Sequence, residues 1–78
     1  MAWLEDVTRH IAARTGIDEQ SLAVSDRDAQ VLLDLAGYAA HETGERTNAP
    51  LLCHVVGRAV ARGASLADLD AAVREYHA

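Results

Sequence analysis

Apolar residues recur with helical spacing in four segments of the chain, about residues 2–15, 26–43, 49–62 and 66–77. In the first segment, Leu4, Val7 and Ile11 fall on one face of a helix. Most apolar residues are alanine, leucine and valine, and the aromatic residues that favour strands are few. We therefore predict an all-α fold, a compact four-helix bundle in which residues 1–78 form a single helical domain.

Small and polar residues mark the ends of these helices. Three glycines follow apolar segments, in the place where a left-handed residue commonly ends a helix: Gly16, Gly44 and Gly63. Three polar residues precede the later helices as N-cap candidates: Ser25, Asn48 and Ser65. Pro50 lies in the first turn of the third helix, where a missing N–H costs least. These signals place the four helix boundaries.

The second helix, about residues 26–43, is the most apolar around its circumference. Seven apolar residues cover well over half of it: Val31, Leu32, Leu35, Ala36, Tyr38, Ala39 and Ala40. A helix of this kind needs neighbours on most sides, so we predict that it is the central one. Asp34 and His41 lie on its narrow polar face.

The remaining helices each present one apolar side. The third puts its core residues at Leu52, Val55, Val56, Ala59 and Val60, and the fourth at Leu66, Leu69, Val73 and Tyr76. Gly57 and Ala61 are four residues apart on the third helix, which predicts the close approach of a neighbouring backbone.

Two features precede the second helix. Residues 17–24 form a connector with room for a short extra helical turn, and we expect Ile17 and Leu22 to pin it to the core. Trp3 is either a core anchor or an interface hot spot, and we favour the core.

Charge and composition exclude several classes of function. The net charge of −5 lacks the basic footprint of a nucleic-acid-binding protein and disfavours an anionic membrane. No apolar stretch reaches the ~20 residues of a membrane span, and no signal peptide is evident. Cys53 is the single cysteine, so we expect a cytoplasmic protein. A chain this short has a marginal core, which favours a protein partner or a homodimer.

Catalytic and metal-binding patterns are weak. Cys53 and His54 are adjacent on a helix and point about 100° apart, no histidine pair stands four residues apart, and there is no CxxC motif. We therefore predict a protein that is not an enzyme and holds no cofactor. The alternative is a small metal-binding or cysteine-dependent protein that uses Cys53 with His41 or His54 across helices.

The junction between the second and third helices is the candidate binding region, with His41, Arg46, Asn48 and Pro50 as its residues. Two helix ends meet there, which leaves backbone carbonyls on one side and N–H groups on the other without helical partners. In one interpretation His41 and Arg46 satisfy the carbonyls and Asn48 caps the third helix. In the other, Arg46 and the N–H groups face a partner's acidic side chain or a phosphate.

Several short runs resemble a small actinobacterial family of unknown function. These runs are Trp3-Leu4-Glu5, Leu32-Leu33-Asp34-Leu35-Ala36, Ala40-His41, Glu45-Arg46, Ala49-Pro50-Leu51 and Gly57. The resemblance extends over about residues 3–63, and His41, Arg46, Ala49, Pro50 and Leu51 are the matched positions of the junction. This chain departs from the family in two places: the link from His41 to Glu45 is one residue longer, and Leu52-Cys53-His54 replaces threonines and Phe.

Members of that family are often encoded beside, or fused to, molybdenum-cofactor guanylyltransferases. The resemblance therefore implies an accessory, protein-interaction role near molybdenum-cofactor biosynthesis, with a molybdenum-cofactor enzyme as the partner. It implies no catalytic residues.

Overall fold

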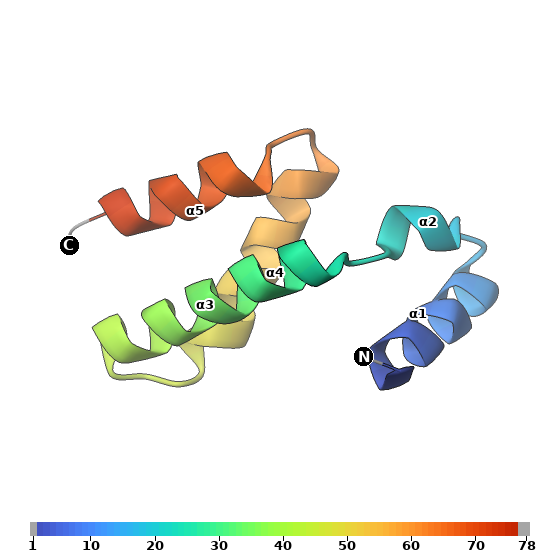
Figure 1. Ribbon diagram of the computed structural model, residues 1–78, viewed down its shortest axis with the longest axis horizontal. Coiled ribbons are helices and arrows are strands. Elements are labelled where there is room, and N and C mark those ends of the chain that lie inside the picture. Colours follow the sequence, from blue (N-terminus) through green and yellow to red (C-terminus); the bar gives the residue numbers. More distant parts are fainter. Residues whose placement is uncertain (1, 77–78) are drawn as a thin grey trace.

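A computed structural model describes residues 2–76, and every regular element in them is a helix (Figure 1). The long helices are α1 (Ala2–Thr15), α3 (Asp26–Thr43), α4 (Asn48–Ala61) and α5 (Leu66–Glu75), and a single helical turn, α2 (Glu19–Leu22), lies in the first connector. The all-α prediction and the short extra turn are confirmed. The fourth predicted helix ran to residue 77, and His77 lies outside the described residues.

The helix ends follow the glycine and serine signals. Gly16, Gly44 and Gly63 have φ angles of 76°, 71° and 105°, the left-handed region that glycine enters without a steric penalty. The hydroxyl of Ser25 accepts a hydrogen bond from Asp28 N, and that of Ser65 accepts one from Asp68 N, each at 3.1 Å. The predicted stops and two of the three predicted caps are therefore confirmed.

Replacing Ser25 by alanine is expected to lower the free energy of unfolding by about 1 kcal/mol, because Asp28 N loses its acceptor. Thr47→Ala is the matched control, since Thr47 occupies the cap position of α4 but its side chain makes no capping hydrogen bond. Urea denaturation of both variants checks this. An equal loss in the two variants would show that the Ser25 hydroxyl contributes nothing specific.

The helices form two groups rather than one compact bundle. Helix α1 contacts α2 alone, whereas α3, α4 and α5 contact one another (Figure 1). The molecule measures 40 × 24 × 20 Å, and its radius of gyration is 13.5 Å, against about 11.5 Å for a compact domain of this length. The predicted compact bundle is not confirmed, because α1 does not pack on the other long helices. Nor is a uniquely central α3 confirmed, since α4 also touches both of its neighbours.

The core is small. Only four of the described apolar residues are buried: Ala12, Leu35, Ala39 and Val56. Most predicted core residues of α3 are half-buried, in agreement with its wide apolar surface. Several other predicted core residues are exposed because no helix covers them: Trp3, Ile11, Val55, Val60 and Tyr76. The core position favoured for Trp3 is wrong, since its side chain is 75% exposed.

Two smaller predictions, for Ile17 and for Gly57, are also wrong, because no other described part of the chain packs against these residues. Ile17 is exposed and does not pin the connector, although Leu22 is half-buried. A Cβ added at Gly57 would meet no atom within 4 Å, so no backbone approaches α4 closely there. The connector and this side of α4 are therefore both left uncovered by neighbouring helices.

Candidate functional site

Thr43 organises the junction between α3 and α4. Its hydroxyl donates to Ala39 O at 2.7 Å and accepts from Glu45 N at 3.2 Å. The side-chain amide of Asn48 also donates to this hydroxyl, at 3.0 Å. Gly44 N donates to Ala40 O, which completes the end of α3. The threonine therefore holds the last turn of α3, the turn and the first residue of α4 together.

Asn48 does not cap α4, so its predicted role is wrong. Residues 45–47 form a turn in which Asn48 N donates to Glu45 O and Ala49 N donates to Arg46 O. The residue before the helix is Thr47, in a right-handed helical conformation that directs no side chain to the free N–H groups. Asn48 is already the first residue of α4, and its amide reaches back to Thr43 instead.

The two charged or titratable residues of the predicted binding set, His41 and Arg46, are exposed. Within the described part of the chain, neither side chain makes a hydrogen bond or ion pair, so neither satisfies a carbonyl at the end of α3. Pro50 is exposed in the first turn of α4, as predicted. The purely structural interpretation of Arg46 and His41 therefore has no contact to support it.

A groove of about 690 Å³ opens beside this junction. Its walls come from the C-terminal half of α3, the N-terminal half of α4 and the end of α5. Ten residues line it: Tyr38, Ala39, Glu42, Thr43, Asn48, Leu51, Leu52, Val55, Val73 and Tyr76. Most of this lining is apolar, with Glu42, Thr43 and Asn48 supplying polar groups on the junction side. The arrangement is that of a surface for an apolar partner segment.

Arg74 joins two walls of this groove. Its guanidinium carbon lies 4.9 Å from the centre of the Tyr38 ring, and its Nε donates to Asp70 at 3.1 Å. The first contact links α5 to α3, and the second fixes the arginine along α5. The ring of Tyr38 is thereby held at the groove.

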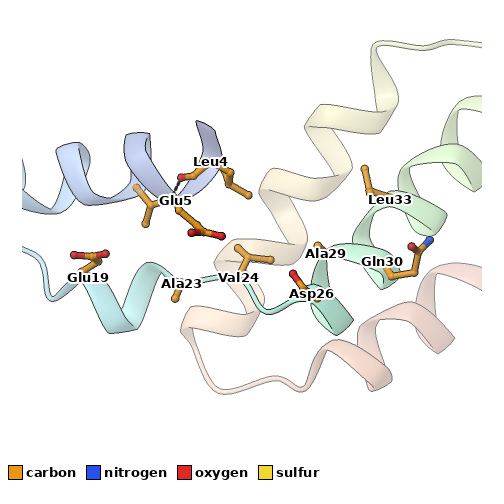
Figure 2. A pocket seen from close by; sticks show the side chains of 10 residues that line it. Leu4, Glu5, Glu19, Ala23, Val24, Asp26, Ala29, Gln30 and Leu33 are labelled. Carbon is orange, nitrogen blue, oxygen red and sulfur yellow. Dashed lines mark hydrogen bonds between the residues drawn. The ribbon is translucent and has the colours of Figure 1, made fainter. Parts of the chain in front are cut away.

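A smaller hollow of about 270 Å³ lies at the elbow where the N-terminal part meets α3 (Figure 2). Leu4 and Glu5 of α1 approach it from one side, and Gln30 and Leu33 of α3 from the other, with Val24 of the link between them. Arg9 of α1 forms an ion pair with Glu19 of α2, with 3.7 Å between Arg9 Nε and Glu19 Oε2. The first turns of α1 therefore lie beside the start of α3 across this hollow, without packing on it.

The cysteine and histidines of the described residues form no cluster that could hold a metal ion. Cys53 is half-buried on α4, while His10, His41 and His54 are exposed. Among residues 2–76 there is no group of three or more His, Cys, Asp or Glu side chains placed to hold a metal ion. None of the helices described is both long and apolar enough to cross a bilayer.

Sequence reasoning found the junction but missed the groove. Leu51 and Val55, one helical turn apart on α4, and Tyr76 at the end of α5 are exposed on it. An apolar residue on α4 outside the predicted core stripe, Leu51, was the available signal. That Leu51 lies on a groove could be recognised only once the packing of α5 against α3 and α4 was known.

Comparison with known proteins gives one match. A family model described as a domain of unknown function (DUF6457) matches residues 1–78, a longer stretch than the resemblance over residues 3–63. No curated protein and no solved structure matches the chain.

Proposed function

Since the chain belongs to the family described as a domain of unknown function (DUF6457), we propose its function from its surface: it is a non-catalytic accessory domain that acts by binding protein. The observation that carries the proposal is the groove between α3, α4 and α5, which leaves Leu51, Val55 and Tyr76 exposed side by side with the polar junction. Exposed apolar surface bordered by polar groups is typical of protein-binding sites.

The junction supplies the charged part of the proposed surface. Arg46 and His41 are exposed and free of side-chain partners among the described residues, so they are available to a partner's acidic group. Asn48 and Pro50 contribute differently. Asn48 fixes the turn through Thr43, and Pro50 presents an exposed ring at the start of α4. We propose these four residues as the partner-binding set.

Replacing Arg46 by alanine is expected to abolish capture of the partner while the melting temperature stays within about 2 °C, because the side chain is exposed and makes no hydrogen bond or ion pair within residues 2–76. Arg58→Ala is the control, since Arg58 is also exposed and lies near the other end of α4. Pull-down and thermal melts of both variants measure the two effects. A lowered melting temperature with intact capture would contradict the proposal and favour a structural role.

The partner we propose is a molybdenum-cofactor enzyme in the cytoplasm, with the guanylyltransferase as the first candidate. The support is the resemblance of residues such as His41, Arg46 and Pro50 to a family encoded beside that enzyme. A molybdenum-cofactor gene next to this one, and co-purification of the two products, are the expected results. If the neighbouring genes belong to an unrelated pathway and the two products do not co-purify, this partner is wrong. The proposed role in binding protein is then not contradicted.

Elemental analysis distinguishes the proposed function from its alternative. The alternative is a metal-binding or cysteine-dependent protein that uses Cys53 with His41 or His54. The proposal expects no stoichiometric metal in the purified protein. Stoichiometric zinc or iron that is lost in a Cys53→Ser variant would overturn it.

A further inference from the structure

The chain exposes more surface than a folded monomer of its size. A globular monomer of 8.4 kDa exposes about 4,600 Å². This chain exposes 6178 Å², an excess of about 1,600 Å². A stable protein–protein interface removes about 800 Å² from each partner, so the excess is more than one interface needs.

Two exposed apolar surfaces are candidates for such an interface, and they lie at opposite ends of the molecule. One is on α1, which touches no helix except α2 and carries Trp3 and Ile11 uncovered. The other is the groove of about 690 Å³ between α3, α4 and α5, at the far end from α1 (Figure 1). A groove of that volume is filled by an inserted helix face, whereas packing against a second groove would leave it hollow.

Helix α1 has the dimensions and side chains to fill such a groove. Trp3 and Ile11 are eight residues apart, which is about 12 Å along a helix and matches two turns of α4. Trp3 is the largest apolar side chain of the chain and is 75% exposed. Tryptophan is one of the three residue types most enriched among the hot spots of protein interfaces.

The α1 helix of the same chain cannot reach this groove while it stays packed on α2. Leu4 and Glu5 line the elbow together with Val24 and Asp26, so the first turn of α1 lies beside the start of α3 (Figure 2). The groove begins at Tyr38, about 18 Å further along α3. Turning the α1–α2 pair about the link keeps Trp3 near that link and away from the groove.

We propose that the groove binds α1 of a second copy of this chain, so that two antiparallel copies exchange their N-terminal helices. This inference deepens the proposed function and rests on it, because it names one protein that the domain binds. Each copy has α1 at one end and the groove at the other, so a two-fold axis satisfies both contacts at once. Each groove then holds a fourth long helix against α3, α4 and α5, which restores the four-helix packing absent from the single chain.

The first test is the mass of the full chain by light scattering over a range of concentrations. The expected mass is twice 8.4 kDa, and Leu51→Glu or Trp3→Ala is expected to halve it. Val60→Glu is the control, because Val60 is also exposed on α4, at 44% against 64% for Leu51, but lines neither the groove nor the elbow. Circular dichroism confirms that each variant is folded.

A monomer at every concentration overturns the inference, and so does a dimer that Leu51→Glu leaves intact. In the second case the chain is still an interaction domain, so the proposed function survives while the groove assignment fails. Capture of a different partner through Arg46 is measured separately and does not depend on either outcome.

Disulfide trapping tests the exchange itself, in a Cys53→Ser background. A chain with Trp3→Cys mixed with a chain with Leu51→Cys is expected to give a mixed disulfide on oxidation. Val60→Cys in place of Leu51→Cys is expected to give at least tenfold less, because Val60 lines neither the groove nor the elbow. A dilute chain that carries both Trp3→Cys and Leu51→Cys and closes a disulfide within itself would overturn the exchange.

Discussion

Replacing Leu35 by alanine is expected to lower the free energy of unfolding by about 2–5 kcal/mol. Leu35 is 0% exposed and is the largest fully buried side chain in residues 2–76. Domains have a free energy of unfolding of about 0.05–0.15 kcal/mol per residue, which is about 4–12 kcal/mol for 78 residues. With so few buried residues this chain belongs at the low end of that range, so the variant is expected to be largely unfolded near body temperature.

Leu33→Ala is the control for this experiment, because Leu33 lies two residues earlier on α3 and is 60% exposed. Its expected cost is below about 1 kcal/mol. Urea denaturation followed by circular dichroism measures both variants. Equal midpoints would mean that the interior of the helical group is not organised around Leu35.

Replacing Val56 by aspartate is expected to prevent folding of α3, α4 and α5. Val56 is 2% exposed, and a carboxylate there would lose its hydration without gaining a cation, at a cost of several kcal/mol. No described polar or charged side chain is buried beside it to compensate. The expected spectrum is that of a mostly unfolded chain.

The adjacent residue provides the contrast. Val55 is 61% exposed, so Val55→Asp is expected to keep the helical spectrum. The two variants have the same composition and differ only in the side of α4 that carries the charge. A folded Val56→Asp protein, or an unfolded Val55→Asp protein, would show that α4 is rotated relative to this structure.

Local signals made the helices predictable. Glycine stops and serine caps act within a few residues of their own position, so Gly44 and Ser25 mark helix ends whatever the tertiary structure. The wide apolar surface of α3 likewise predicted contact with more than one helix, and α3 touches α4 and α5, although it is not uniquely central. Asn48 failed as a cap because three residues of turn precede α4, and nothing in the residue types fixes where such a turn ends.

The packing of the helices was less predictable. Periodicity identifies an apolar face but not what covers it, so Trp3 and Tyr76 were assigned to a core that does not reach them. The candidate site likewise has a part that the sequence predicts and a part that it does not. Arg46 and His41 were found from their place beside helix ends, whereas the hydrogen bonds of Thr43 and the groove depend on how α4 and α5 lie against α3.

The order of contacts along the chain has a kinetic consequence. Each helix touches only helices that are next, or next but one, in sequence. Domains dominated by such local contacts fold in microseconds to milliseconds, because little loop-closure entropy is lost before the contacts form. A chain of this kind reaches its helical form long before it meets another molecule at cellular concentrations. Folding therefore precedes association, and only the rate of association depends on how much of the protein is made.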